Sequence, residues 1–382
     1  MKRCIYLDNA ATTSMYPEVL EEMLPFLKEE YGNPAGIYPL AGQSARAVAR
    51  AREQAAGLIG ARKEEIYFTS GGSESDNWAL KAAAEGYQQK GRHIITSRIE
   101  HHAVLHSCEY LERQGFQVTY VETDRQGVVR TDKLLQAIRP DTILISVMAA
   151  NNEIGTLQPL KEIGQIAAER GILFHTDAVQ AVGHIPLDVE ALQIDLLSAS
   201  AHKLHGPKGV GMLYIRRGVK LPAYLHGGAQ ERHHRAGTLN VPAIVGFGKA
   251  AQLAAERMEE NAGRVTQLRN HLIERILTEV PDSCLNGSRT KRLPGNASFC
   301  FAQVEGESLL IMLAQQGICG SGGSACTTAE TEPSHVLQAI GVEKELAKGA
   351  LRLTLSEFTT LEEIDTAVDT IREQAAKLRR FR

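Results

Sequence analysis

Short apolar runs alternate with longer amphipathic stretches between residues 65 and 215. The apolar runs predict strands at 66–68, 93–97, 117–121, 142–148, 172–175, 195–198 and 210–215. The intervening stretches, such as 131–138 and 160–169, have the spacing of helices. Strands that alternate with helices are typical of a mainly parallel sheet that is covered on both faces. We therefore predict an α/β protein whose large domain contains a mainly parallel, seven-stranded sheet.

The segments on either side of this sheet predict a second domain. Helices are expected from 17 to before 32, at 43–58, 242–280 and 307–316, and from 360 onward, with further strands at 297–302 and 350–355. The later elements would form a smaller C-terminal α/β domain. The predicted division is 1–15 as an N-terminal segment of the small domain, 16–255 as the large domain and 256–382 as the small domain.

The composition is that of a globular enzyme. Hydrophobic residues make up 43% and charged residues 23% of the 382 positions, which excludes a disordered chain. The net charge of −3 gives no reason to expect nucleic acid as a partner, and no apolar run approaches the ~20 residues that span a bilayer. No signal-peptide pattern opens the chain, and six cysteines are too few for a disulfide scaffold. We expect a cytoplasmic enzyme with reduced thiols and no membrane association.

The segment 200–209, Ser-Ala-His-Lys-Leu-His-Gly-Pro-Lys-Gly, follows the predicted strand 195–198. Open α/β sheets bind ligands at the carboxyl ends of their strands, so Lys203 lies where a ligand is expected. A desolvated lysine amine can react with a carbonyl cofactor. The ordinary alternative is a solvated lysine in a surface turn.

A second motif, Thr-Ser-Gly-Gly-Ser-Glu-Ser-Asp-Asn at 69–77, joins the predicted strand 66–68 to a helix. Glycines at such a turn free backbone N–H groups, and the start of a helix favours an anion. We therefore predict a phosphate site at Gly72 and Ser73, with a plain capped loop as the alternative. The motif is neither a Walker loop nor the dinucleotide fingerprint.

Asp177 follows the predicted strand 172–175, where it could cap a helix or hold a proton on a heteroaromatic nitrogen. Together with Lys203 and the phosphate site, the second interpretation is favoured, because the three groups would bind three parts of pyridoxal 5'-phosphate. His101 follows the predicted strand 93–97, and the alternative for it is a solvated or structural histidine. Neither HExxH nor paired CxxC spacing occurs, so no metal site is predicted.

The cysteines fall into two settings. Cys326 lies in Gly-Ile-Cys-Gly-Ser-Gly-Gly-Ser-Ala-Cys-Thr-Thr-Ala-Glu at 317–330, whose small residues predict a mobile loop at about 319–332 that carries a reactive thiol. A flexible linker with an incidental cysteine is the alternative. Cys319 lies in the same segment, and the apolar surroundings of the other four cysteines predict core positions, namely Cys4, Cys108, Cys284 and Cys300.

With these motifs the chain resembles the cysteine desulfurases, pyridoxal-phosphate enzymes of the class V aminotransferase-like group, and is most similar to their NifS/IscS branch. The resemblance runs from Tyr-Leu-Asp-Asn-Ala-Ala-Thr-Thr at 6–13 to Leu-Arg-Leu-Thr-Leu-Ser-Glu-Phe at 351–358 and includes Ser-Ala-Cys-Thr at 324–327. It implies fold type I of the pyridoxal-phosphate transferases and a homodimer.

The resemblance implies a role in cofactor binding for most of the candidate residues. Lys203 would hold the cofactor covalently, Asp177 would bond its pyridine nitrogen and Gln180 its ring hydroxyl. His101 would lie over the ring face and assist proton transfer, with Asn152 beside the ring hydroxyl and the substrate. The phosphate would be bound by Gly72, Ser73, Ser200, His202 and, across the dimer interface, Thr238 of the partner subunit.

The implied activity is the conversion of L-cysteine to L-alanine, with Arg352 pairing with the substrate carboxylate and Cys326 accepting the sulfur as a persulfide. A protein acceptor would then receive the sulfur for iron–sulfur cluster assembly or tRNA thiolation. A selenocysteine lyase or another pyridoxal-phosphate β-lyase would share the same cofactor residues. A sulfur-relay partner without catalysis would need none of them. Dependence of alanine release on Cys326 distinguishes the desulfurase from the other enzymes, and the presence of the full set of cofactor and substrate residues argues against the relay partner.

Overall fold

The computed structural model describes residues 4–322 and 333–380. Its central sheet consists of β2 (Ile66–Thr69), β3 (His93–Ser97), β4 (Gln117–Val121), β5 (Thr142–Ser146), β6 (Leu173–Asp177), β7 (Leu196–Ser200) and β8 (Gly211–Ile215). The spatial order is β2-β8-β7-β6-β5-β3-β4. Strand β8 runs antiparallel to both of its neighbours, and the other pairs are parallel. The prediction of a mainly parallel, seven-stranded sheet is confirmed.

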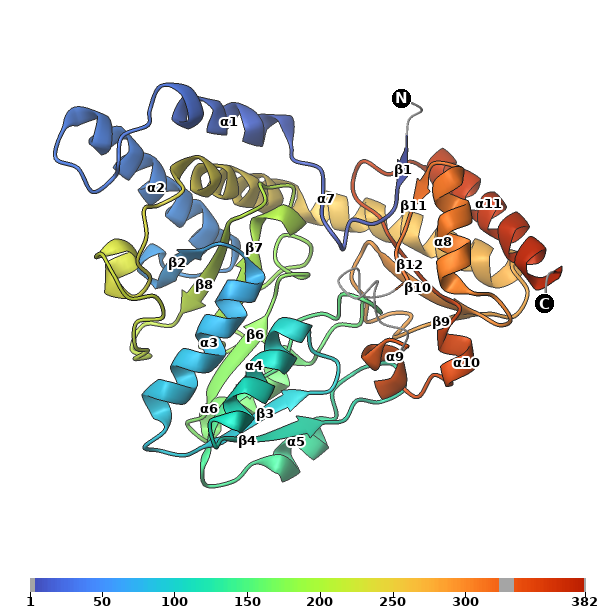
Figure 1. Ribbon diagram of the computed structural model, residues 1–382, viewed down its shortest axis with the longest axis horizontal. Helices are drawn as coiled ribbons and strands as arrows, with labels where there is room; N and C mark the ends of the chain where they lie inside the picture. Colours follow the sequence, from blue (N-terminus) through green and yellow to red (C-terminus); the bar gives the residue numbers. More distant parts are fainter. Residues whose placement is uncertain (1–3, 323–332, 381–382) are drawn as a thin grey trace.

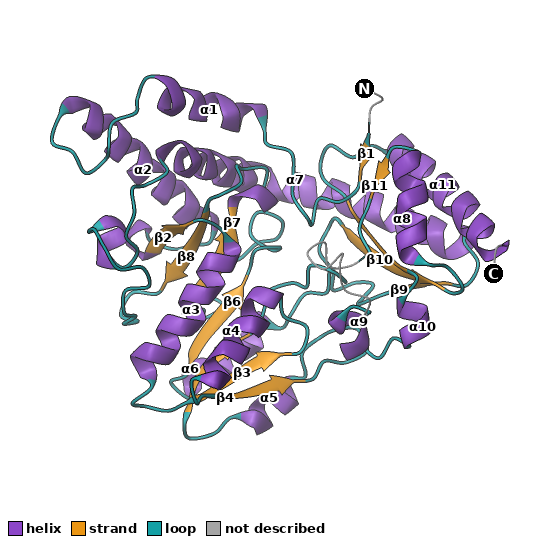
Figure 2. Ribbon diagram, in the orientation of Figure 1, coloured by secondary structure: helices purple, strands orange, loops and turns teal. Residues whose placement is uncertain are grey.

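Helices cover both faces of this sheet (Figures 1 and 2). They are α2 (Pro39–Leu58), α3 (Gly72–Tyr87), α4 (His102–Arg113), α5 (Thr131–Ala137), α6 (Leu160–Glu169) and α7 (Val241–Glu279). Successive strand residues point to opposite faces, so Leu196 packs into the core under α3 and α4 while Leu197 packs into the core under α2, α6 and α7. Both leucines are fully buried. The faces are therefore closed, and the strand ends are the part of the sheet left for a ligand.

A second, antiparallel sheet lies beside the first and has the order β12-β10-β9. Its strands are β9 (Ser283–Leu285), β10 (Asn296–Phe301) and β12 (Ala350–Thr354). Its core is formed with α8 (Gly306–Gln315) and α11 (Leu361–Arg380). Two short helices, α9 (His335–Ala339) and α10 (Lys344–Ala347), lie at its edge. The N-terminal strand β1 (Ile5–Tyr6) pairs with β11 (Ile318–Cys319) in a small sheet of its own.

The long helix α7 connects the two parts of the molecule (Figure 1). Its first half packs on α2 and on α1 (Pro17–Lys28), and its second half enters the core of the antiparallel sheet. The helix begins with Pro242 in its first turn, and the side chain of Asn240 accepts a hydrogen bond from the backbone N–H of Ala243. Proline and an asparagine cap favour a helix start at this point.

A buried ion pair fastens the segment 229–238 to the large sheet. Arg52 donates to Glu231 at 2.7 Å, and the same carboxylate accepts from the backbone N–H of Phe68 at 3.1 Å. Glu231 and the next two residues have positive φ values of 44°, 56° and 67°, a region that residues other than glycine rarely adopt. The ion pair therefore holds a strained turn in place, and this turn positions Arg235 and Thr238.

Several details differ from the sequence-based expectations. Strand β6 includes Asp177 instead of ending before it, and β5 ends at Ser146 rather than at 148. The expectation that Cys4 is a core residue is wrong, because its side chain is exposed, and Cys284 is half-buried. All cysteines within 4–322 and 333–380 are free thiols. No helix in these ranges is long and apolar enough to cross a membrane.

Candidate active site

A cavity of ≈ 240 Å³ lies at the carboxyl ends of β6 and β7. Its walls come from both sheets and from the N-terminal segment. Most of the predicted site residues line it: Gly72, Ser73, His101, Asn152, Asp177, Gln180, Ser200, His202, Lys203 and Arg352. These predicted residues come from six separate segments of the chain. Thr238 is exposed and is absent from this lining, and Cys326 lies outside the described residues.

Lys203 ends the 3-10 turn Ala201–Lys203, which directly follows β7. Its amine donates hydrogen bonds to the backbone carbonyls of Ala10 and Ala11, the second at 2.8 Å. Gln180 donates to the same carbonyl of Ala10 at 3.1 Å. The N-terminal segment therefore contributes the wall against which the lysine lies, a contact that the sequence did not predict.

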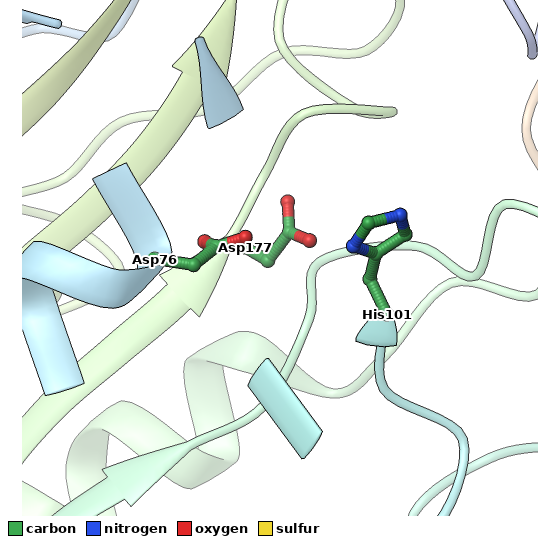
Figure 3. Close-up of side chains that lie close together, drawn as sticks. All are labelled: Asp76, His101 and Asp177. Carbon is green, nitrogen blue, oxygen red and sulfur yellow. The ribbon is translucent and has the colours of Figure 1, made fainter. Parts of the chain in front are cut away.

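Asp177 is the last residue of β6 and is buried. Its Oδ1 accepts from the backbone N–H of Val179 at 2.9 Å. Burial raises the pKa of this carboxyl, while His101, the Val179 N–H and Lys203 lower it. Figure 3 shows the side chains of Asp177 and His101 pointing toward one another, with Asp76 on the side of Asp177 away from His101. The net effect is a raised pKa, and the carboxylate form of Asp177 can accept a hydrogen bond from a proton-bearing nitrogen of a ligand in the cavity.

A second buried carboxyl, Asp76, comes from the first turns of α3. One side-chain atom from each of Asp76, His101 and Asp177 lies within 4.8 Å of the others. Burial, followed by the charge of Asp177, raises the pKa of Asp76 well above its usual range. Its Oδ1 lies 3.7 Å from His175, but burial lowers the pKa of that histidine to about 3, so the contact is not an ion pair. Burial thus favours the protonated form of Asp76, whereas the neighbours of Asp177 oppose the same effect of burial on Asp177.

The start of α3 forms one end of the cavity. Gly72 is the first residue of this helix, and a Cβ atom there would lie 2.5 Å from Cγ2 of Val179. The close packing explains why glycine occupies this position. Ser73, Ser200 and His202 line the same end of the cavity. Burial lowers the pKa of His202 to about 4, so its ring is neutral near pH 7. Backbone N–H groups at a helix start and nearby hydroxyls are suited to a phosphate group.

His101 caps α4. Its Nδ1 accepts a hydrogen bond from the backbone N–H of Ala103 at 3.1 Å. Burial lowers the pKa of the ring, an effect that Asp177 opposes. A neutral ring whose Nδ1 accepts a hydrogen bond carries its proton on Nε2. His101 can therefore donate a hydrogen bond from Nε2 in the cavity.

Arg352, in β12, is only 2% exposed. Its Nη2 pairs with Asp8 at 2.9 Å, and its Nη1 donates to the backbone carbonyl of Asn152 at 3.1 Å. Among the described residues, its buried Nε has no hydrogen-bond partner. A guanidinium that is fixed at two nitrogens and keeps a further N–H is suited to an additional carboxylate. Asn152 contributes its backbone oxygen to this arrangement, whereas the sequence suggested its side chain.

The functional groups that line the cavity match the parts of pyridoxal phosphate that a protein must bind. The start of α3 and the hydroxyls beside it suit the phosphate, Asp177 suits the ring nitrogen, and the amine of Lys203 suits the aldehyde carbon. Sequence reasoning missed Asp8, for which no local signal exists. It also missed Asp76, although its spacing from the buried Ala79 and Leu80 places it on the buried face of α3.

Comparisons with known proteins identify the family of the chain. The profile of the class-V aminotransferase family matches residues 5–367. A cysteine desulfurase IscS of Methanosarcina thermophila is 55% identical over 99% of this chain and 93% of that protein, and one of Dictyoglomus turgidum is 52% identical over 99% and 96%. A solved NifS-like protein superposes with a TM-score of 0.93 at 40% identity, covering 98% of this chain and all of that one. A NifS-like protein of Rickettsia africae gives 0.88 at 30% identity over 98% and 100%.

Proposed function

The chain belongs to the class-V aminotransferase family and is a cysteine desulfurase that depends on pyridoxal phosphate, and we propose how its own residues carry out that reaction. The observation that supports the assignment is that Lys203, Asp177 and Arg352 line one cavity. They come from β12 and from the ends of two neighbouring parallel strands. An amine, a carboxylate and a buried arginine together supply the groups needed for the cofactor and for an amino acid.

The cofactor residues have separate tasks in this proposal. Lys203 holds the cofactor covalently, and Asp177 accepts the proton-bearing ring nitrogen. Gln180 binds the ring hydroxyl from the position in which it now donates to Ala10. The phosphate is bound by the start of α3 at Gly72 and Ser73 and by Ser200 and His202. Pyridoxal phosphate, when bound, acts as an electron sink that acidifies the Cα proton of the amino acid.

The substrate is held by its carboxylate. Arg352 binds this group through its Nε–H, while Asp8 and the Asn152 carbonyl keep the guanidinium in place. Lys203 is the base that takes the Cα proton of L-cysteine. His101 donates a hydrogen bond from Nε2 to the substrate sulfur, because its Nδ1 is engaged by the Ala103 N–H.

Cys326 completes the reaction as the sulfur acceptor. Its thiolate attacks the substrate sulfur, an S–S bond forms, and the C–S bond breaks with its electron pair on carbon. Cβ then takes a proton equivalent to the one lost from the Cys326 thiol, and Lys203 returns a proton to Cα, which gives L-alanine and a persulfide on Cys326. The support for this step is the Ser-Ala-Cys-Thr motif. The persulfide sulfur passes to a protein acceptor, in iron–sulfur cluster assembly or tRNA thiolation.

The test compares the purified enzyme with two cysteine variants. Wild type, Cys326→Ala and Cys319→Ala are incubated with L-cysteine while the visible spectrum, alanine and sulfide are followed. We expect all three to show the yellow band of bound cofactor, and Cys326→Ala alone to release no more than one alanine per site. Full turnover by Cys326→Ala would refute the persulfide step. A Lys203→Ala variant that retains the cofactor on dialysis as well as wild type would refute the covalent attachment.

We also propose a homodimer in which Thr238 reaches the phosphate of the partner's site. The Arg235 side chain pairs with Glu74, in the first turn of α3, at 2.7 Å, which holds this segment beside the phosphate end of the cavity. Large apolar side chains are exposed in α1 and in the connection to α2, including Leu27 at 58% and Ile37 at 103%. Exposed apolar side chains concentrated in one region are typical of an interface.

Hybrid dimers test this arrangement. A Lys203→Ala subunit is combined with a Thr238→Val subunit that carries a different affinity tag, and the hybrid is purified. If Thr238 acts across the interface, the one working site has an intact partner threonine, and its cofactor affinity equals that of wild type. If the affinity instead equals that of the Thr238→Val homodimer, Thr238 acts within its own subunit and the proposal fails.

The finer organisation follows from the same reasoning. We propose the division into 1–15, 16–255 and 256–382, with the boundary inside α7, because the two halves of that helix pack into different cores. We propose a cytoplasmic location, which agrees with the free thiols of all the described cysteines. Limited proteolysis and fractionation of cells that express the protein test these two statements.

A further inference from the structure

Two cysteine side chains meet outside the catalytic cavity, where β1 runs beside β11 (Figure 1). The Sγ atoms of Cys4 and Cys319 are 3.1 Å apart, although the residues are 315 positions apart in the chain. The strands are parallel, with Tyr6 opposite Cys319, and the backbone N–H groups of Ile5 and Leu7 donate to the carbonyls of Gly317 and Cys319, both at 2.9 Å. Cys4 and Cys319 therefore lie on the same side of a paired ribbon.

We propose that Cys4 and Cys319 are a redox-active thiol pair that forms a disulfide with a low-molecular-weight disulfide as the oxidant. The bond needs an S–S distance of about 2.05 Å, so the two sulfur atoms must approach by about 1 Å. Neither residue lines the cofactor cavity. The pair is thus a modification site separate from the desulfurase chemistry.

The surroundings of the two thiols determine the order of the exchange. Cys4 is exposed, so an external disulfide reaches it first. Burial, the neighbouring Cys4 and Asp8 raise the pKa of Cys319 to about 11, so this thiol is a poor nucleophile toward an external reagent near pH 7. Its contact with Cys4 makes the second step intramolecular, and a high effective concentration compensates for the small thiolate fraction.

Atoms and electrons balance in two exchanges. The Cys4 thiolate attacks the external disulfide, which forms a mixed disulfide and releases one small thiolate. The Cys319 thiolate then attacks the Cys4 sulfur, which forms the Cys4–Cys319 bond and releases the second small thiolate. The protein loses two electrons and two protons, and the oxidant leaves as two thiols.

A bond at this point would join the two strands that lead to Arg352. Strand β1 continues to Asp8, which pairs with the Arg352 guanidinium at 2.9 Å. Strand β11 continues to Ser321, whose backbone N–H donates to the Arg352 carbonyl and whose carbonyl accepts from the Arg352 N–H, at 3.1 and 2.6 Å. The disulfide would therefore tie together both supports of the arginine that binds the substrate carboxylate.

A second cysteine pair provides a matched control. Cys284 and Cys300 lie opposite one another on β9 and β10, and Cys300 is fully buried, with its sulfur accepting a hydrogen bond from Asn286 at 3.2 Å. Closure of this pair needs the Cys300 thiolate, and the hydrogen bond with Cys284, together with burial, raises the pKa of the Cys300 thiol strongly. We therefore expect no disulfide between Cys284 and Cys300 under conditions that oxidise Cys4 and Cys319.

The test counts and maps thiols in the holoenzyme, in a Cys326→Ala background that removes the persulfide. The reduced protein is equilibrated with defined mixtures of glutathione and its disulfide, alkylated, denatured, digested and analysed by mass spectrometry. We expect the loss of two thiols, one peptide pair linked through Cys4 and Cys319, and complete reversal by dithiothreitol. Cys284→Ser should behave identically, and Cys4→Ser should lose no thiol. Cys319→Ser should accumulate the mixed disulfide of Cys4 with glutathione.

Two outcomes would overturn the proposal. One is a wild-type Cys4 that accumulates as a stable mixed disulfide without closing onto Cys319. The other is a loss of thiols that maps to Cys284 and Cys300 and disappears in Cys284→Ser. The readout does not depend on desulfurase activity, so its failure is distinguishable from a failure of the proposed function.

Discussion

Replacing Arg352 by lysine keeps the positive charge but removes the fork that the structure uses. The guanidinium pairs with Asp8 through Nη2 at 2.9 Å and with the carbonyl of Asn152 through Nη1 at 3.1 Å, and it retains a buried Nε–H for a ligand. A lysine ammonium has three donors that radiate from one point, so it cannot reproduce three separated and planar N–H directions. We expect Arg352→Lys to weaken the binding of the substrate carboxylate.

The magnitude follows from the number of bonds that are lost. A hydrogen bond to a charged group contributes about 1.5–3 kcal/mol, and at least one such bond to the carboxylate is lost in the variant. Since each 1.4 kcal/mol is about tenfold, kcat/KM for L-cysteine should fall roughly 10- to 100-fold. Cysteamine has the same amine and thiol but no carboxylate, so its affinity for the holoenzyme should change less than about threefold.

The assay measures alanine formation from L-cysteine and the spectral titration of the bound cofactor by cysteamine. Arg264→Lys is the matched control, because Arg264 binds the backbone carbonyls of Glu357 and Thr359 and is absent from the cavity lining. Thermal unfolding checks that both variants fold. A kcat/KM for L-cysteine within about threefold of wild type, or an equal loss of affinity for cysteamine, would show that Arg352 does not bind the carboxylate.

Three further predictions concern Glu100, Gly72 and Glu231. Burial raises the pKa of Glu100 from 4.5 to about 8, so the stability that the protonated group contributes is complete below about pH 4.5 and is lost as the pH rises to about 8. The unfolding midpoint of the wild type, taken relative to that of Glu100→Gln, should therefore decrease as the pH is raised from 5 to 8. A difference between the two midpoints that stays constant over this range would contradict the raised pKa of Glu100. Gly72→Ala should weaken cofactor binding roughly tenfold or more because its Cβ would collide with Val179, and Val179→Ala should restore the affinity measured by spectral titration. Glu231→Gln leaves its buried arginine partner unpaired and should lower the free energy of unfolding, measured by chemical denaturation, by about 3 kcal/mol. Asp132→Asn removes an exposed ion pair and should lower it by at most about 0.5 kcal/mol. Equal losses in the two variants would refute the role of burial.

The sequence predicted much of the large domain because its elements are long and periodic. The strands from 66 to 215 were located to within a few residues. Because open α/β sheets bind ligands at the carboxyl ends of their strands, the cofactor-binding residues were expected at a common edge. Asp177 and Lys203 meet there because β6 and β7 are neighbouring parallel strands whose carboxyl ends coincide. Their convergence follows from topology, which the alternation of strands and helices determines.

The limits of the prediction lie at the short elements. Strands β1 and β11 have two residues each, which is too short for a periodic pattern. The apolar residues beside Cys4 suggested a core position, but the pairing of β1 with β11 leaves its thiol on the surface. Asp76 was overlooked because an acidic residue in a polar motif resembles a solvated one, and its burial depends on the packing of α3 against the sheet.

By itself, the sequence determined the α/β class, the order of the elements and the residue types that bind the cofactor, because these depend on local periodicity and on short motifs. Tertiary structure alone decided that the N-terminal segment returns to the site, where Ala10 and Ala11 hold Lys203 and Asp8 holds Arg352. It also brought Cys4 to Cys319 across 315 positions. Such contacts carry no local signal, because they depend on how separately predicted elements pack against one another.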